Sequence, residues 1–106
     1  MTAEEKQKIL QELGGIPEEF YDELIVEFKQ QYKAQVAEIR EALKTADLTR
    51  ARLSAHSLSG TSGNLRLTRL HQAAKALEMA IKEGQGPDVI DRNFKALEAT
   101  DPETGE

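Results

Sequence analysis

The sequence has no cysteine and no tryptophan, and its other aromatic residues are only three phenylalanines and two tyrosines. The absence of cysteine excludes a disulfide framework and any chemistry based on a thiolate. With so few aromatic side chains, a folded core has to be built mainly from leucine, isoleucine, valine and alanine. The 106 residues fit a single domain, whose core must be economical because small domains bury a smaller share of their surface.

Long apolar runs and an excess of positive charge are also missing. No stretch approaches the roughly 20 apolar residues of a membrane-spanning helix. The segment Met1–Leu13 is acidic and polar, unlike a signal peptide. The formal net charge of −5 argues against binding to nucleic acid or to an anionic membrane surface. We therefore expect a cytoplasmic protein with neither a nucleic-acid nor a membrane partner.

The patterns that are present indicate helices, because apolar residues recur every three or four positions and no segment alternates like a strand. Turns and breaks in the apolar periodicity separate five helical segments: Thr2–Leu13, about Pro17 to Thr45, Asp47 to about Asn64, Leu67 to Ile81, and about Pro87 to Glu98. Short connections favour antiparallel neighbours. The prediction is an all-α fold: an antiparallel up-down four-helix bundle, with the short first helix covering one end. Residues 1–99 form this domain, and residues 100–106 are expected to be a disordered tail.

The second helix is long and carries one apolar stripe, which is expected to face the core. Its members are Phe20, Leu24, Phe28, Tyr32, Val36, Ile39 and Leu43. The charged residues between them are expected to form a solvated surface.

The third helix contains an unusual stretch, Ser54–Asn64, in which two glycines accompany five serine or threonine residues. Each glycine in a helix costs roughly 1 kcal/mol relative to alanine, so the pair needs a reason. On a helical wheel Ala55 and Leu58 point inward and His56 points to solvent, with Gly60 and Gly63 within about 40° of it. Arg52, Leu53 and Ser59 lie within about 60° on its flanks.

An exposed imidazole with little bulk beside it suits a group that is transferred between proteins. The neutral ring has a nitrogen lone pair that can attack phosphorus. No phosphate-binding glycine loop and no clustered metal ligands are found, so we expect no metal site and no cofactor of its own. The simpler alternative is an ordinary surface histidine. The other histidine, His71, is expected to be a packing residue at the edge of the core.

The stretch Ala55–Leu65 resembles the signature of histidine-containing phosphotransfer (HPt) domains, Ala-His-x-Leu-Lys-Gly-Ser-Ala/Ser. The similarity continues on either side of it, at Ala42, Leu43, Asp47, Leu70, Ala74, Leu77, Glu78 and Ala80. The resemblance implies a bundle whose His56 is the phosphoacceptor, exchanging a phosphoryl group with an aspartate of a response-regulator receiver domain. It implies no catalytic activity of the chain's own. The partners are then a receiver domain, which supplies magnesium, and a hybrid histidine kinase.

Two departures from the family pattern concern the charge around the phosphoryl group. Ser59 stands where the family usually has a lysine, and Arg66 stands where it usually has a glycine. Arg52, Ser59 and Gly60 are assigned as neighbours of the phosphoryl group, and the hypothesis is that Arg52 or Arg66 replaces the missing lysine. Leu53, Gly60 and Gly63 are assigned to partner docking.

Two other functions remain open from the sequence. The chain can be an adaptor that docks receiver domains or other helices without being phosphorylated, which the missing lysine at Ser59 favours. It can also be the phosphoacceptor domain of a longer histidine kinase. The presence of His56, Gly60 and Gly63 favours a phosphorelay carrier in two-component signal transduction, with a phosphohistidine as the carried form.

Overall fold

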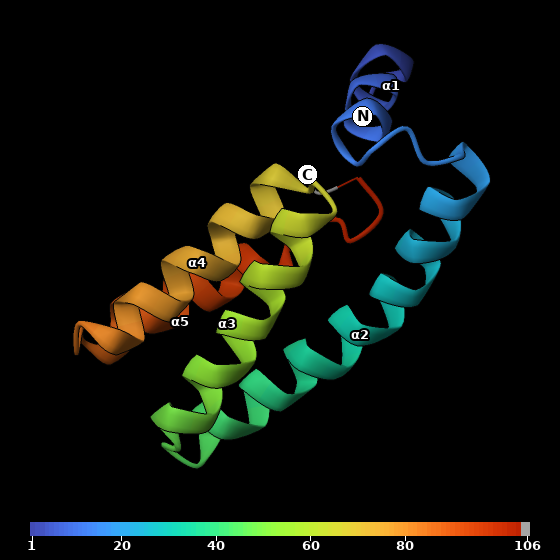
Figure 1. Cartoon of the computed structure of the whole chain (residues 1–106). Coiled ribbons are helices and arrows are strands. Elements are labelled where there is room, and N and C mark those ends of the chain that lie inside the picture. The colour runs from blue at the N-terminus through green and yellow to red at the C-terminus, as the bar shows by residue number, and fades with distance from the viewer. Residues whose placement is uncertain (105–106) are drawn as a thin grey trace.

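The computed structural model describes residues 1–104, which contain five helices and no strand (Figure 1). The helices are α1 (Ala3–Glu12), α2 (Glu18–Lys44), α3 (Leu48–Asn64), α4 (Thr68–Lys82) and α5 (Pro87–Glu98). The all-α prediction is confirmed. None of the helices in this part of the chain is long and apolar enough to cross a bilayer.

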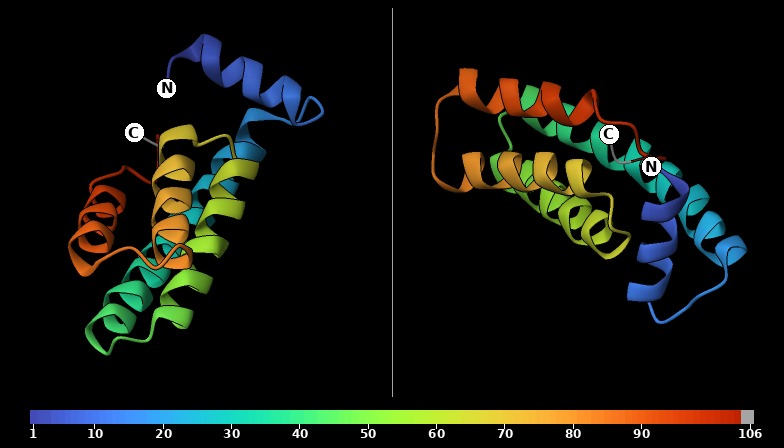
Figure 2. Two further views of the ribbon diagram at one scale, coloured as in Figure 1. Left: turned by 90° about the vertical axis from the view of Figure 1, so that its left-hand side faces the viewer. Right: turned by 90° about the horizontal axis from the view of Figure 1, so that it is seen from above.

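Helices α2 to α5 run up and down in an elongated bundle, while α1 lies across one end of it (Figure 2). Helix α3 packs between α2 and α4, and α5 packs on α4. The buried side chain of Leu10 ties α1 to the core, and ion pairs from Lys6 to Asp22 (2.7 Å) and from Arg66 to Glu12 (3.2 Å) hold it from outside. This is the predicted bundle with its short N-terminal helix.

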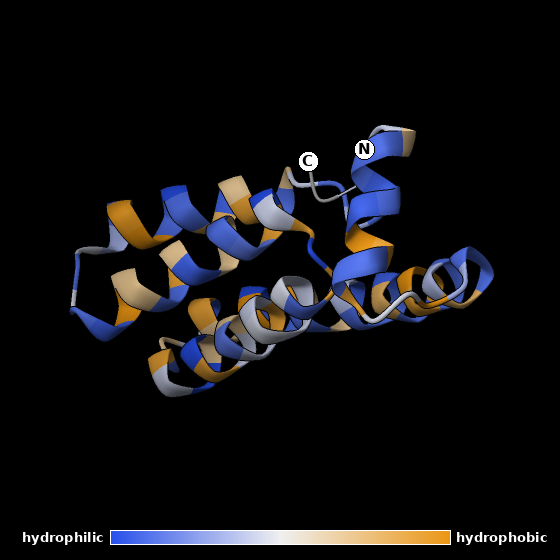
Figure 3. Cartoon of the chain, turned by 45° about the horizontal axis from the view of Figure 1, so that its top comes forward, coloured by the Kyte–Doolittle hydropathy of each residue, from blue (hydrophilic) through white to orange (hydrophobic). Residues whose placement is uncertain are grey.

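All five helices contribute apolar residues to one core. Along each helix, hydrophobic and hydrophilic residues are interspersed, as the ribbon colours show (Figure 3). Aliphatic residues of four helices are fully buried in this core, among them Ile39, Leu58, Leu70, Leu77 and Leu97. The scarcity of aromatic residues is thus met by a mainly aliphatic core.

The predicted apolar stripe of α2 is wrong at its N-terminal end. The structure buries Tyr21 and Ile25, whereas Phe20 is 49% exposed and Leu24 is only partly buried. Steps of four residues drift by about 40° each around the helix, so Phe20 lies about 80° from Phe28, whereas Tyr21 lies only about 20° from it. Tyr21 also places its hydroxyl where it donates a 2.6 Å hydrogen bond to the Leu65 carbonyl.

Residues 100–104, expected to be disordered, are placed against α2. The Tyr32 hydroxyl lies 2.9 Å from the Leu97 carbonyl and 3.1 Å from that of Thr100, offering both a buried donor. Thr100 is itself buried, and Glu103 pairs with Lys29 at 2.7 Å. The Tyr32 hydroxyl on α2 is thus a hydrogen-bond partner for backbone carbonyls at the end of α5 and just beyond it. The remainder of the predicted tail, residues 105–106, lies outside the described residues.

Candidate functional site

The exposed position of His56 follows from how α3 begins and packs. The Asp47 carboxylate accepts a 3.1 Å hydrogen bond from the Arg50 amide and so caps the helix start. Ala55 and Leu58 are fully buried, which turns the intervening face outward. The His56 side chain is 67% exposed there, as the helical wheel indicates.

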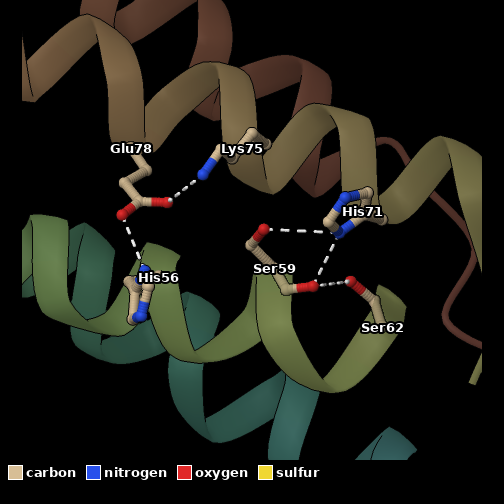
Figure 4. Close-up of polar contacts among 6 residues, drawn as sticks. All are labelled: His56, Ser59, Ser62, His71, Lys75 and Glu78. Carbon is tan, nitrogen blue, oxygen red and sulfur yellow. Dashed lines mark hydrogen bonds and ion pairs between the residues drawn. The ribbon is translucent and has the colours of Figure 1, made fainter. Parts of the chain in front are cut away.

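One ring nitrogen of His56 is held by α4. His56 Nδ1 lies 2.7 Å from Oε2 of Glu78, whose side chain is only 8% exposed (Figure 4). A carboxylate accepts hydrogen bonds, so Nδ1 carries the hydrogen and the neutral ring leaves its lone pair on Nε2. The contact therefore favours one tautomer of the neutral ring and orients it, with the lone pair on Nε2.

The second oxygen of Glu78 adds a cation to the site. Lys75 Nζ lies 3.7 Å from Glu78 Oε1, and the Lys75 side chain is half-exposed. Oε1 is buried and has no hydrogen-bond partner among the described residues. His56, Glu78 and Lys75 thus form a row of imidazole, carboxylate and ammonium groups across the α3–α4 interface.

Ser59 lies in a different environment from the one predicted for a neighbour of the phosphoryl group. It is buried, and its carbonyl accepts a 2.7 Å hydrogen bond from His71 Nδ1. Its hydroxyl lies 3.3 Å from the same nitrogen. The Ser62 hydroxyl also donates to the Ser59 carbonyl, at 3.3 Å. Ser59 is therefore part of the packing between α3 and α4 and is directed toward His71.

The two glycines of α3 have different surroundings. A Cβ added at Gly60 meets nothing within 4 Å, so this position is open on the surface that carries His56. A Cβ added at Gly63 would lie 3.0 Å from Nδ1 of His71. Gly63, predicted from the sequence as a docking residue, makes room for the His71 ring between α3 and α4. His71 itself is partly buried, where a packing residue at the edge of the core was expected.

The remaining predicted residues divide between the surface and the end of α3. Leu53 is 55% exposed. Arg52 is partly buried beside Ile81 and makes no hydrogen bond or ion pair within residues 1–104. Arg66 follows the end of α3, where it pairs with Glu12 and donates a 3.1 Å hydrogen bond to the Gly63 carbonyl.

Arg66 cannot serve the phosphoryl group from this position. It is ten residues beyond His56, about 15 Å further along the helix direction. Its backbone φ of +62° also explains why a glycine suits the turn, since this region favours residues without a side chain. Of the two arginines in the hypothesis, only Arg52 stays near His56.

Two members of the site, Glu78 and Lys75, were not identified as site residues from the sequence. The signal for Glu78 was a glutamate on a buried stripe, four residues after Ala74 and three before Ile81. Glutamate is seldom fully buried unless it is paired. Within residues 1–104, no three His, Asp or Glu side chains are grouped in a way that holds a metal ion.

Comparison with protein families gives one match. The model of the family described as "Hpt domain" matches residues 23–99, which include His56, Lys75 and Glu78. Searches of the curated proteins and of the solved structures each returned no significant match. The matched region covers most of the chain and leaves α1 and the start of α2 outside it.

Proposed function

Because the chain belongs to the Hpt domain family, we propose that it carries a phosphoryl group on Nε2 of His56 between the proteins of a two-component phosphorelay. The family implies phosphotransfer in two-component signalling, with the domain as carrier rather than catalyst. The observation that supports His56 as the carrier is its exposed ring, whose Nδ1 is held 2.7 Å from the Glu78 carboxylate. An exposed, oriented nucleophile is what the reaction requires of a carrier.

The proposed transfer starts from an aspartyl phosphate on a receiver domain. The Nε2 lone pair attacks phosphorus, a P–N bond forms, and the P–O bond to the aspartate breaks. The aspartate leaves as a carboxylate and takes the bonding electron pair. The hydrogen on Nδ1 remains in its bond to Glu78, so the ring loses no proton in this step and the phosphorylated ring carries one positive charge opposite the carboxylate. The reverse step passes the phosphoryl group to a second receiver, and the magnesium is expected on the receiver side.

Partner docking is proposed for the surface of α3 around His56. Leu53 lies about one turn before His56 and Gly60 about one turn after it, so all three share one face of the helix. Leu53 is more than half exposed and offers an apolar contact, while the open space at Gly60 admits the partner's backbone. We expect the receiver domain, and the hybrid kinase that bears one, to bind here.

The direct test is incubation with a phosphorylated receiver domain and magnesium, followed by intact mass measurement. We expect the wild-type chain to gain one acid-labile phosphoryl group and His56→Gln to gain none. His71→Gln is the matched control and should gain the group as wild type does.

The adaptor function has one observation in its favour, the buried Ser59 at the position of the family's usual lysine. Receiver binding without any mass gain in wild type, over several receivers, would replace the carrier by the adaptor.

A further inference from the structure

We propose that Lys75 supplies the positive charge for the phosphoryl group on His56, so that this charge comes from α4 instead of α3. The inference rests on the proposed phosphorylation of His56. It assigns Lys75 a role that neither Arg52 nor Arg66 fills.

The need for a cation follows from the surroundings of His56. A phosphoryl group adds about 1.5 to 2 negative charges at neutral pH. The Glu78 carboxylate already lies within hydrogen-bond distance of the same imidazole ring and is almost fully buried. The ring that keeps a hydrogen on Nδ1 and holds phosphorus on Nε2 carries one positive charge. The phosphoryl group and the carboxylate together carry about 2.5 to 3 negative charges, so an excess of negative charge remains at the site. A positive group within reach of both lowers the free energy of the phosphorylated state.

Ser59 cannot be that group, because it carries no charge and is buried between α3 and α4. The Ser59 side chain is directed into the α3–α4 interface, where His71 contacts both its hydroxyl and its carbonyl. The exposed face beside it, at Gly60, has no side chain. Helix α3 therefore carries no cation on the C-terminal side of His56 near the site.

The antiparallel register of α3 and α4 places Lys75 at this level of the bundle. His56 faces Glu78, whereas Ser59 faces His71 one turn further along α3. Lys75 lies between Glu78 and His71 along α4, so its backbone is level with the segment between His56 and Ser59 (Figure 4). The Lys75 ammonium group thus comes from the neighbouring helix, at the same height in the bundle as position 59, where the family usually has its lysine.

The resting contact of Lys75 is loose enough to be exchanged. A distance of 3.7 Å from Nζ to Glu78 Oε1 is longer than a normal N–H···O hydrogen bond, and the side chain is 53% exposed. Lysine is flexible and donates in three directions. The proposed role requires Nζ to leave Glu78 Oε1 and turn to an oxygen of the phosphoryl group, while Glu78 keeps its bond to His56 Nδ1. In the unphosphorylated state the same lysine compensates the buried carboxylate.

Arg52 is the competing cation, and it lies on the other side of His56. It is one turn earlier in α3 and level with Ile81 and Lys82 of α4. That side is away from Gly60, where the structure leaves space for the partner. The two assignments therefore differ in which variant weakens the phosphorylated state.

The experiment compares wild type with Lys75→Ala, Lys75→Arg, Arg52→Ala and, as a matched exposed lysine of α4, Lys82→Ala. Each is loaded by a phosphorylated receiver with magnesium, and the equilibrium level of phosphohistidine is measured by intact mass. We expect Lys75→Ala to lower the equilibrium constant about 3- to 10-fold, the effect of losing one charge-assisted contact at a half-exposed site. Lys75→Arg should retain most of the wild-type level, and Lys82→Ala should match wild type.

An equal loss in Lys75→Ala and Lys82→Ala, or a loss confined to Arg52→Ala, would overturn the assignment. A second loading with potassium phosphoramidate, a small phosphoryl donor, needs no partner and separates this inference from the proposed function. Wild type that accepts phosphate from phosphoramidate but from no receiver would contradict the carrier function alone. The ³¹P signal of phospho-His56 should then titrate at higher pH in Lys75→Ala than in wild type, because the cation favours the dianion. Identical titration curves would reject the role of Lys75.

Discussion

The two histidines of this chain make opposite use of the same helix interface. His56 extends from α3 toward α4 and His71 from α4 toward α3, and each has Nδ1 at 2.7 Å from an oxygen across the interface. The acceptor for His56 is the carboxylate of Glu78, and the ring is mostly exposed. The acceptor for His71 is the backbone carbonyl of Ser59, and its ring packs over Gly63.

The difference shows that the surroundings, and not the residue type, decide which histidine ring stays accessible to a partner. A carboxylate orients the ring of His56 and leaves Nε2 open to a partner. A main-chain carbonyl fixes the ring of His71 in a packed position, where a glycine is needed to admit it. His56 is therefore the proposed phosphoacceptor and His71 a packing residue between α3 and α4. Each of the following experiments contrasts the two environments.

The largest expected effect comes from exchanging each histidine for glutamine. His56→Gln should abolish phosphoryl uptake from a receiver, because glutamine has no nucleophilic nitrogen, while its free energy of unfolding changes by less than about 1 kcal/mol at an exposed site. His71→Gln should retain uptake and lose about 1 kcal/mol of stability with its interhelical hydrogen bond. Mass spectrometry and urea denaturation measure the two effects, and a reversed pattern would reject the division of roles.

The next effect isolates the carboxylate. Glu78→Ala should slow phosphoryl transfer to His56 about tenfold, because the ring loses the charged hydrogen bond that sets its tautomer and orientation. Glu78→Gln should fall between this variant and wild type, since its amide oxygen can still accept from Nδ1. Glu83→Ala, at the exposed end of α4, is the control. Rapid-quench transfer kinetics at constant receiver concentration check the order, and equal rates in all four proteins would contradict it.

The two glycines give a pair of variants with different expected stabilities. Gly60→Ala should raise the free energy of unfolding by about 0.5 to 1 kcal/mol, because alanine favours the helix and its Cβ meets open space. At Gly63→Ala the contact with His71 at 3.0 Å should remove this gain, leaving the variant at least about 1 kcal/mol less stable than Gly60→Ala. Thermal or urea unfolding measures both.

A double-variant cycle sharpens the glycine comparison. In a His71→Ala background the penalty at Gly63→Ala should disappear, because the ring that opposes the new Cβ is gone. A penalty that persists without His71 would mean that another group needs the space.

The smallest expected effect concerns docking. Leu53→Ala should weaken receiver binding about three- to fivefold, as expected for losing one apolar contact at the edge of an interface. Phe20→Ala removes an apolar side chain of similar exposure far from His56 and should leave affinity unchanged. Isothermal titration with an unphosphorylated receiver measures both, and equal losses would remove Leu53 from the docking surface.

Most of the fold was predictable because local signals mark the helix ends. Asp47 caps α3, Gly84 ends α4 with a φ of +70°, and Pro87 begins α5. The turns at Ala46 and Arg66 have the same positive φ without a glycine, so residue type alone did not indicate their geometry. The burial of Tyr21 in place of Phe20 depends on how far the stripe drifts around α2.

The site was only half predictable, for a related reason. A wheel drawn for one helix places His56 outward, but it carries no information on what the neighbouring helix presents to it. The contact with Glu78, the burial of Ser59 and the packing of His71 on Gly63 all depend on the register between α3 and α4. That register is set by how the two helices pack in the core, so it could not be predicted from the residue pattern of either helix alone.

The most direct test of the account is to determine which ring nitrogen of His56 carries phosphorus. The chain is labelled with ¹⁵N-histidine and phosphorylated by a receiver, and the P–N coupling and ring-nitrogen shifts are read by NMR. The account predicts phosphorus on Nε2, with a hydrogen retained on Nδ1 in its bond to Glu78. Phosphorus on Nδ1 of His56, or on either nitrogen of His71, would contradict it.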